Sequence, residues 1–276
     1  MTADSKDIAI IGMGRVGTHL SRALRAAGHR VTEIRTHDAV EAARCAAGED
    51  LVLLCVQDER LPELNKQLRL PAGRTVVAHV SGATPLQAIA DIAPHHGVFY
   101  CLQTFSPGDE IDYRRMPILV EADDEPTAIL LETVARSLSR NVRRIDSQQR
   151  LGLHLAGAFA SNYSNLMYTA AEQVLQACGL DLSLLQPIIE QTAAKLRRMP
   201  PLEAQTGPAL RRDEGTLARH RQLLKDLPVT DKLLDIYNEL ADLIVTMRAD
   251  GHAGKPVAGR ETGAAPAREP RSNFKN

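Results

Sequence analysis

The sequence predicts an α/β fold, in which a Rossmann-type, mainly parallel sheet domain is followed by an all-α C-terminal domain. Three observations support this prediction. Short apolar runs alternate with helical stretches up to about residue 150. After Arg150 the strand signal stops and three long helical segments follow. A glycine-rich turn lies between the first apolar run and a helix. We therefore expect a sheet domain over residues 1–150, a helical domain over 151–250 and a mobile tail over 251–276.

The apolar runs are short and nearly continuous, as expected for strands that helices cover on both faces. They span residues 8–11, 31–34, 51–56, 75–80, 97–102 and 117–121, with a further short strand at 142–145. Helices are expected at 18–27, 151–178, 181–199 and 216–249, the last broken near Pro228, with Asp181 as a helix N-cap and Gly179 as a helix stop. The segment over 199–215 is rich in Pro and Gly, and we expect it to be too irregular for core. The tail is rich in Gly, Ala, Pro and charge.

Composition excludes several function classes. The chain has 276 residues, a formal net charge of −1 and 3% aromatic residues without Trp. Without a basic surplus or stacking aromatics, neither a nucleic-acid partner nor an acidic membrane surface is expected. The hydrophobic share of 44% and the charged share of 24% are those of a soluble globular protein.

The cysteines and the N-terminus predict a cytoplasmic location. Cys45, Cys55, Cys101 and Cys178 lack metal-type spacing, and Cys55 and Cys101 lie in apolar runs, where a thiol behaves as a small hydrophobe. We expect reduced, structural thiols and no metal site. No apolar segment of a signal peptide precedes the first strand. Residues 151–171 carry no formal charge, but the polar side chains among them favour a buried helix over a membrane span.

The glycine-rich turn predicts a dinucleotide site. Ile11 leads into Gly12-Met13-Gly14-Arg15-Val16-Gly17, and a helix follows. In such a turn, the first glycine permits the tight bend, the second admits a pyrophosphate and the third allows close packing of helix and strand. The helix N-terminus then offers free N–H groups to phosphates. The candidate cofactor-binding residues are Gly12, Met13, Gly14, Arg15, Val16, Gly17, Arg35, Val56 and Gln57.

The end of the second strand favours NADP over NAD. An acidic residue there would bind the ribose 2′-hydroxyl of NAD, whereas Arg35 stands at the expected strand end and can hold a 2′-phosphate by paired hydrogen bonds. Glu33 and Asp38 keep NAD possible.

Polar residues recur after other strands, where ligands bind in open α/β sheets. They are Gln57 and Asp58, Ser81 and Gly82, and Gln103 and Thr104. On the first long helix, one stripe is small and hydrogen-bonding while the next is apolar. The polar stripe is formed by His154, Ala158, Ser161, Asn162 and Asn165, and the apolar one by Leu155, Phe159, Tyr163 and Leu166. We interpret the polar stripe as a pocket lining; a buried structural His154 is the alternative.

A second polar constellation lies between the later helices. Thr206, Arg212, Asp213 and His220 are candidate substrate-binding residues, in which Arg212 would anchor an anionic group. The alternative is a capped surface loop with ion pairs along the helix.

The segments GMGRVG, HVSGA, LQTF, HLAGAFASNY and TGPALRRDEGTLARH resemble those of bacterial two-domain Rossmann-like oxidoreductases, over about residues 6–245. Deazaflavin-dependent NADP reductases, pyrroline-carboxylate reductases, ketopantoate reductases and hydroxyacid dehydrogenases are more distant relatives by fold. The resemblance implies an NADP-linked reductase with a helical domain that dimerises and bounds the substrate site. Asn162 matches the asparagine of the hydroxyacid dehydrogenases, but Phe159 replaces their catalytic lysine. Tyr100-Cys101 replaces the His-Pro pair typical of the family.

From these observations we expect hydride transfer between NADP(H) and a small carbonyl or imine substrate bound between the domains of a homodimer. His154 would be the general acid–base, Asn162 and Ser81 would position the substrate together with Gln103, and Arg212 would anchor a carboxylate. A non-catalytic NADP(H) sensor is the alternative, because the familiar lysine is absent.

Overall fold

The computed structural model describes residues 5–71 and 73–249, so the expected tail over 251–276 lies outside the described residues. The chain divides into two compact units, Met1–Ser164 and Asn165–Asn276. Each unit is described by itself below.

The first unit is built on one seven-stranded sheet with the strand order β2-β1-β3-β4-β5-β6-β7. The strands β1 to β5 are mutually parallel, β6 is antiparallel to β5, and β7 is parallel to β6. This confirms the predicted mainly parallel sheet. The strands are β1 Asp7–Ile11, β2 Arg30–Ile34, β3 Leu51–Leu54, β4 Val76–His79, β5 His95–Cys101, β6 Ile118–Ala122 and β7 Val142–Arg144.

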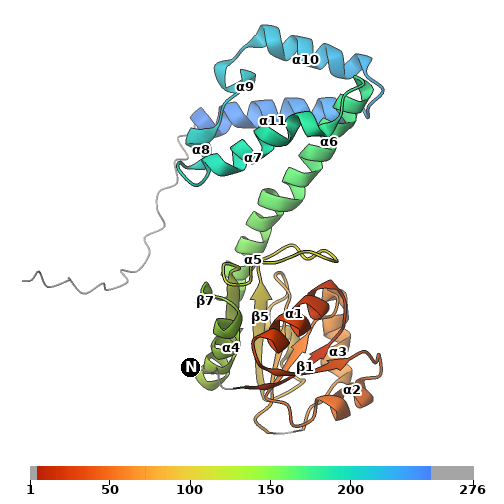
Figure 1. Ribbon diagram of the computed structural model, residues 1–276, viewed down its shortest axis with the longest axis vertical. Helices are drawn as coiled ribbons and strands as arrows, with labels where there is room; N and C mark the ends of the chain where they lie inside the picture. The colour runs from red at the N-terminus through yellow and green to blue at the C-terminus, as the bar shows by residue number, and fades with distance from the viewer. Residues whose placement is uncertain (1–4, 72, 250–276) are drawn as a thin grey trace, which may run out of the picture. The chain divides into compact units, whose positions relative to one another are not determined.

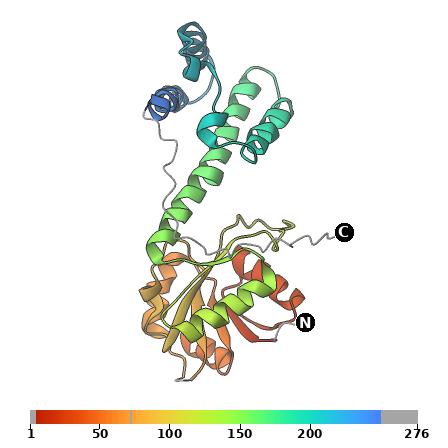
Figure 2. The ribbon, with the colours of Figure 1, turned by 90° about the vertical axis from the view of Figure 1, so that its left-hand side faces the viewer.

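Helices cover both faces of this sheet (Figures 1 and 2). Apolar side chains of α1 (Arg15–Ala26) and α4 (Glu125–Leu138) bury one face, and those of α2 (Ala39–Ala46) and α3 (Leu61–Gln67) bury the other. Two short 3-10 turns, η1 (Asp58–Arg60) and η2 (Leu86–Ile89), follow β3 and β4. The central strands β3 and β4 are buried along their whole length, which explains why they read as continuous apolar runs.

The strand register brings the carboxyl ends of the parallel strands to one edge of the sheet. Ile11 pairs with Leu54, Leu54 with His79, and His79 with Val98. The glycine turn and the polar residues that follow β2, β3, β4 and β5 therefore leave the sheet on the same edge, as predicted.

A long helical stretch follows β7. It consists of α5 (Ser147–Gly157), the π-helical turn η3 (Ala158–Tyr163) and α6 (Ser164–Ala177). The helix is as predicted, but its predicted burial is wrong for the single chain, because Leu155 is 56% and Phe159 63% exposed. In the described part of the chain, no helix is long and apolar enough to cross a membrane.

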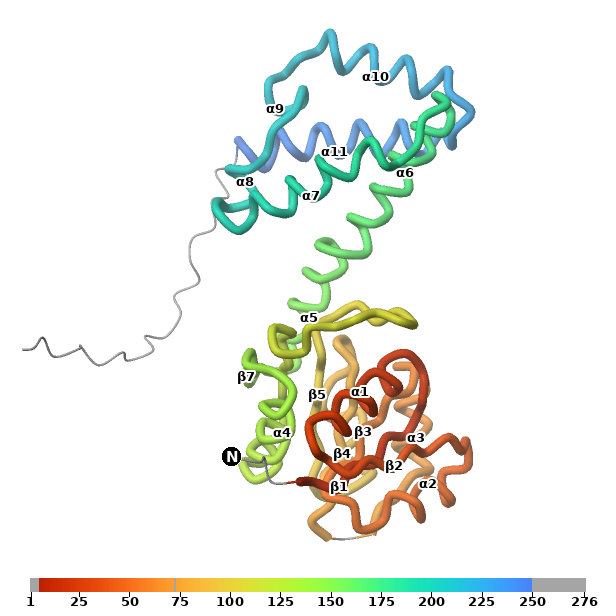
Figure 3. Tube along the Cα trace, viewed as in Figure 1, coloured from red at the N-terminus to blue at the C-terminus, as the bar shows by residue number. Residues whose placement is uncertain are grey.

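The second unit is all helical, as predicted (Figure 3). Besides α6 it contains η4 Leu182–Leu185, α7 Gln186–Lys195, α8 Pro201–Ala204, α9 Pro208–Arg211, α10 Glu214–Asp226 and α11 Lys232–Ala249. Asp181 caps η4, and Gly179 ends α6 with a φ of +73°, so both helix-end predictions are confirmed. The segment over 199–215 was wrongly expected to lie outside the core. It forms α8 and α9, and Ala209 is buried in a cluster with Leu217 of α10.

Candidate functional site

The glycine turn has the geometry that a dinucleotide pyrophosphate requires. Gly12 has a φ of +96°, and a Cβ there would lie 2.6 Å from the Cys55 carbonyl oxygen. A Cβ at Gly17 would lie 2.1 Å from the Gly12 carbonyl oxygen, so α1 packs tightly on β1 only with glycine here. A Cβ at Gly14, in contrast, would meet nothing within 4 Å. This leaves open space where a phosphate would approach the backbone.

The N-terminus of α1 is open to an anion. Among the described residues, no side chain caps this end at Gly14, and the first turn contains no acidic residue. Arg15 occupies the first helical position and is exposed. Free N–H groups and the helix dipole therefore meet at this point, and the Arg15 side chain also lines the cavity described below. A pyrophosphate fits this arrangement.

At the end of β2, both acidic residues that would favour NAD have other partners. Glu33 accepts hydrogen bonds from Ser21 Oγ at 2.7 Å and from Arg25 Nη1 at 2.8 Å. These partners, together with Arg35, hold the pKa of Glu33 below its usual range. Asp38 accepts a hydrogen bond from the Glu41 N–H at 2.8 Å and so caps α2. Arg35 itself is 68% exposed and pairs with Glu33 at 2.9 Å.

The remaining predicted cofactor residues lie beside the turn. Met13 and Val16 pack against the core that α1 covers, and Val56 packs against the other core of the sheet. Val56 Cγ1 lies 3.0 Å from the point where a Cβ of Gly12 would stand. Gln57 follows Val56 and directly precedes η1.

A cavity of about 580 Å³ lies at the same sheet edge, within the first unit. Its lining joins the start of α1, the end of β5, the loop after β5, and the helices α5 and η3. The lining residues are Arg15, Tyr100, Leu102, Gln103, Thr104, Phe105, Ser106, His154, Gly157, Ala158, Ala160, Ser161 and Asn162. The structure thus brings together four predicted site residues, Arg15, Gln103, His154 and Asn162. Of the five residues of the predicted polar stripe, only Asn165 is outside this lining.

Tyr100 and His154 form a pair in this cavity. The Tyr100 hydroxyl lies 3.1 Å from His154 Nδ1, and the two rings meet edge to face at 6.0 Å. Burial raises the pKa of Tyr100 above its usual value. His154 is an exposed residue in the single chain, which the alternative of a buried structural histidine does not predict.

Gly82 allows this pair to lie against the loop after β4. A Cβ at Gly82 would lie 2.5 Å from His154 Nδ1 and 2.9 Å from Cζ of Tyr100. Ser81 organises the loop, because its hydroxyl contacts Asp58 Oδ2 at 2.6 Å and accepts hydrogen bonds from the N–H groups of Ala83 and Thr84. Ser81 is 6% exposed and is not among the lining residues of the cavity. Its predicted contact with substrate stays a prediction.

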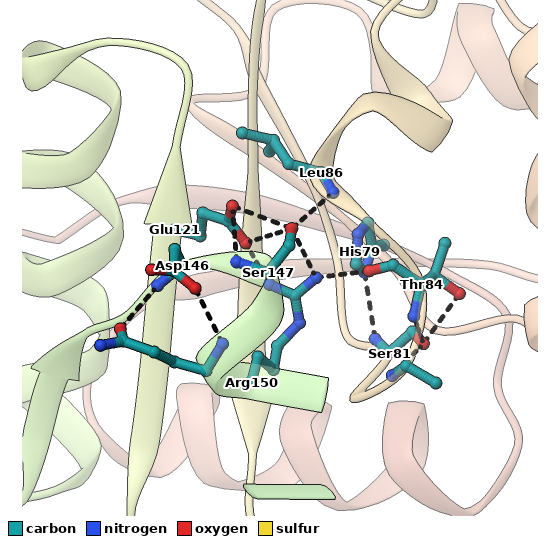
Figure 4. A network of polar contacts seen from close by, with 10 residues as sticks. His79, Ser81, Thr84, Leu86, Glu121, Asp146, Ser147 and Arg150 are labelled. Carbon is teal, nitrogen blue, oxygen red and sulfur yellow. Dashed lines mark hydrogen bonds and ion pairs between the residues drawn. The ribbon is translucent and has the colours of Figure 1, made fainter. Parts of the chain in front are cut away.

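A buried ion pair fixes the start of α5 to the sheet (Figure 4). Arg150, only 1% exposed, pairs with Glu121 of β6 and donates to the Thr84 carbonyl oxygen in the same loop as Gly82. Glu121 also accepts from Ser147 Oγ at 2.9 Å. Because Arg150 precedes His154 by one helical turn, this network sets the position of His154 against the loop and Tyr100.

The predicted residues of the second unit lie around the start of α10. Asp213 Oδ1 accepts the Thr216 N–H at 3.0 Å and caps the helix, which lowers the pKa of Asp213. Arg212 has a φ of +53°, a left-handed conformation that is strained for a side chain of this size. His220 Nδ1 contacts the Tyr237 hydroxyl at 2.8 Å. Thr206 is exposed and lies ahead of α9. Their contact with substrate stays a prediction.

The described cysteines are free, and Cys55 and Cys101 are buried core residues, as predicted. Burial raises the pKa of Cys55 to about 12, so its thiol is inert. At the opposite sheet edge, His95 Nδ1 lies 2.8 Å from Asp124 Oδ2, and Asp123 lies nearby. Asp124 also caps α4, which gives this pair a structural role.

Sequence reasoning missed Tyr100 and Arg150 as parts of the site. Tyr100 stands at a strand end that we had already identified as ligand-facing, and this signal could have found it. Nothing in the local pattern distinguishes Arg150 from a solvated helix residue, because its partner Glu121 lies 29 positions away.

The fold and the glycine turn define a Rossmann-type dinucleotide-binding domain followed by an all-α domain. Residues 2–102 match the family described as a Rossmann-like domain, and residues 116–244 match a domain of unknown function (DUF2520). The crystal structure of a "putative NADP oxidoreductase" from Bacteroides fragilis is 30% identical, with a TM-score of 0.76, and the match covers 88% of this chain and 98% of that one. The chain therefore belongs to this family of two-domain Rossmann-like oxidoreductases.

Two further solved structures share the fold at lower identity. A reductive aminase from Aspergillus terreus, in complex with NADPH and ethyl levulinate, is 17% identical with a TM-score of 0.63 and coverages of 91% and 96%. An imine reductase from Streptomyces aurantiacus is 17% identical with a TM-score of 0.62 and coverages of 86% and 95%. The comparison with curated proteins found no match.

Proposed function

We propose that this protein is an NADP(H)-dependent reductase of a small carbonyl or imine compound. The observation that carries the proposal is the cavity that Arg15 of the glycine turn and the Tyr100–His154 pair line together. Gly12, Gly14, Gly17 and the start of α1 would hold the pyrophosphate, and Arg35 the 2′-phosphate. When bound, the cofactor supplies the hydride. The names of the B. fragilis and A. terreus proteins support this choice of cofactor.

His154 is the proposed proton donor, because histidine is the side chain that most often serves as general acid or base and this one lines the cavity. Nδ1 faces the Tyr100 hydroxyl and the backbone at Gly82, so Nε2 is the nitrogen left for substrate. If the Tyr100 hydroxyl donates to Nδ1, the neutral ring carries its proton on Nε2. Tyr100 is therefore a positioning residue that sets the tautomer and orientation of His154.

The other neutral polar residues of the cavity would orient the substrate. The amides of Gln103 and Asn162 and the hydroxyl of Ser161 offer donors and acceptors for a carbonyl or imine group. π-helical turns occur often at functional sites, and η3 carries Ser161 and Asn162.

The exposed apolar stripe beside the cavity supports a homodimer. Leu151, Leu155, Phe159 and Tyr163 are each at least half exposed on α5 and η3. A contiguous apolar surface of this kind marks an interaction site, and a second copy of the chain is the partner that we propose.

The test is oxidation of NADPH, followed by absorbance, against a panel of 2-oxo acids, ketones and cyclic imines. We expect turnover by the wild type, a fall of about 100-fold in kcat for His154→Gln, and about 10-fold for Tyr100→Phe. NADPH affinity should be unchanged in both variants. His95→Gln, at the other end of β5 from Tyr100, is the control and should retain wild-type kcat.

Tight NADPH binding without turnover of any compound would contradict the proposal and favour the sensor function. Wild-type kcat in His154→Gln would remove this residue from the mechanism. Nitrogen-15 shifts of the His154 ring provide a readout independent of turnover. Wild type should show a protonated Nε2, and the preference for this tautomer should weaken in Tyr100→Phe.

A further inference from the structure

We infer that the cavity takes an anionic carbonyl compound, of the 2-oxo acid class, in preference to a cationic iminium. The inference rests on the proposed reductase function and narrows its substrate. It depends on two independent features, the charge of the cavity and the presence of a proton donor.

Charge is the first feature. Among the described residues that line the cavity, Arg15 is the only arginine or lysine, and none is an aspartate or a glutamate. Tyr100, Gln103, Ser161 and Asn162 add hydroxyl and amide groups that donate and accept hydrogen bonds. A cation placed here would face Arg15 with no carboxylate to balance it, whereas a carboxylate would find a guanidinium and several N–H and O–H donors.

Two carboxylates of the network around the loop after β4 have partners of their own. Asp58 is held by the Ser81 hydroxyl at 2.6 Å, and Glu121 is held by Arg150 and by Ser147 at 2.9 Å. Glu121 thus neutralises a buried arginine, and moving it towards a substrate would leave that arginine unpaired. Breaking a pair of this kind is strongly unfavourable. Neither acid can therefore serve as the counter-ion of an iminium in the cavity.

Proton demand is the second feature. Reduction of a carbonyl adds a hydride to carbon and a proton to oxygen, giving an alcohol while NADPH becomes NADP⁺. Reduction of an iminium gives the amine with the hydride alone, so no proton donor is needed at the reacting atom. The structure nevertheless places His154, with Tyr100 against its Nδ1, in the cavity wall. A proton donor has a role when the substrate is a carbonyl, whose reduction forms an alkoxide, or a neutral imine, which must gain a proton on nitrogen, but not when the substrate is already a cationic iminium.

The experiment compares three compounds of five carbons that differ in charge. They are 2-oxopentanoate, 2-pentanone and 2-methyl-1-pyrroline, which is largely protonated at neutral pH. At saturating NADPH, we expect kcat/KM for 2-oxopentanoate to exceed that for 2-pentanone by about 10-fold or more, with the pyrroline slowest. Faster reduction of the pyrroline than of 2-oxopentanoate would overturn the inference.

Variants at two arginines of α1 test whether Arg15 causes the preference for 2-oxopentanoate over 2-pentanone. At saturating NADPH, Arg15→Gln should raise KM for 2-oxopentanoate about 10-fold more than it raises KM for 2-pentanone, because only the anion uses the guanidinium. Arg22→Gln is the matched control, since Arg22 lies on the same helix but outside the cavity lining, and it should keep the wild-type ratio. An unchanged ratio in Arg15→Gln would contradict the assigned role.

Binding separates this inference from the proposed function. Calorimetry measures the dissociation constants of oxamate, an anion, and pyrrolidinium, a cation. Neither compound is reduced, so the comparison shows which charge the cavity prefers whether or not turnover occurs. Oxamate should bind about 10-fold more tightly than pyrrolidinium, and the preference should fall in Arg15→Gln. Failure to oxidise NADPH would refute the reductase proposal alone. Equal or weaker binding of oxamate would refute the charge preference alone.

Discussion

His79 shows how one buried side chain supports the loop beside the cavity. It is fully buried at the end of β4, and its Nδ1 accepts a hydrogen bond from the Ser81 N–H at 3.2 Å. Burial, and then the nearby charge of Arg150, lower the pKa of His79 to about 4. The ring is therefore neutral at physiological pH, which leaves Nδ1 free to accept and the loop of Ser81 and Gly82 in place.

This lowered pKa predicts a loss of stability in acid. The unfolded chain binds a proton at His79 near pH 6.5, whereas the folded chain binds it only near pH 4. The contribution of neutral His79 to the free energy of unfolding is fully present above pH 6.5 and is lost as the pH falls towards 4. The loss amounts to about 3 kcal/mol. Urea unfolding at pH 7, 5.5 and 4.5 measures it.

The control is His79→Asn, which keeps an acceptor for the Ser81 N–H but cannot titrate. This variant should lose less unfolding free energy than the wild type between pH 7 and pH 4.5. An identical pH dependence in both proteins would show that His79 is not the group responsible.

Local sequence patterns predicted the glycine turn proposed to bind the cofactor, but only some of the residues that line the cavity. Gly12, Gly14 and Gly17 act through backbone geometry within six positions, so the sequence alone predicts their roles. The pairing of Tyr100 with His154 joins positions 54 residues apart, and only the tertiary fold decides it. His154 itself was predictable, because a polar stripe without formal charge is unusual on a solvated helix.

At the scale of elements, the placement of α5 depends on a buried ion pair. Arg150 connects α5 to Glu121 of β6 and to the loop after β4 (Figure 4). Nearby, Arg144 forms an exposed counterpart, because its side chain is 42% exposed and bridges Glu125 and Glu132. The two arginines therefore allow the same substitution to be compared in a buried and an exposed ion pair.

Arg150→Met should lower the free energy of unfolding by about 3 kcal/mol, because it leaves the Glu121 carboxylate without its main partner. Arg144→Met should lower it much less, since water replaces an exposed pair. Adding Glu121→Leu to Arg150→Met should recover part of the loss. Equal effects of the two single substitutions, measured by urea unfolding, would contradict the role assigned to Arg150.

The elements themselves were largely predictable, and the errors have a physical cause. Strand and helix periods are local properties of the sequence, and each predicted strand was found to within a few residues. Burial is not local. The apolar stripe over Leu155 and Phe159 has the composition of a core helix, but both side chains stay more than half exposed in the described part of the single chain. The short helices α8 and α9 were missed because Pro and Gly at helix starts resemble loop signals.

At the scale of the whole molecule, the helical unit has little core of its own. Among its described residues, only Ala209, Leu217 and Ala241 are buried hydrophobics. Large apolar side chains on its helices, such as Leu184 and Ile188, are more than half exposed. So small a core is marginal alone, which agrees with the proposal that a second copy covers the apolar surfaces.

Light scattering after size exclusion should therefore report a dimer for the wild type. Phe159→Glu should shift the protein towards monomer, because it places a charge on the apolar stripe at a side chain that is 63% exposed. Ile129→Glu is the control, since Ile129 is 53% exposed on α4, away from the stripe. A monomeric wild type at micromolar concentration would contradict the proposed dimer.

The most direct test of the central claim, that this chain holds NADP(H) on the turn after β1, is a pair of cofactor titrations. We expect NADPH to bind wild type about 10-fold or more tightly than NADH, and Arg35→Ala to lose this preference. Arg30→Ala is the matched control, since Arg30 is 70% exposed at the opposite end of the same strand, and it should keep the preference. Tighter binding of NADH by the wild type, or binding of neither nucleotide, would contradict the account.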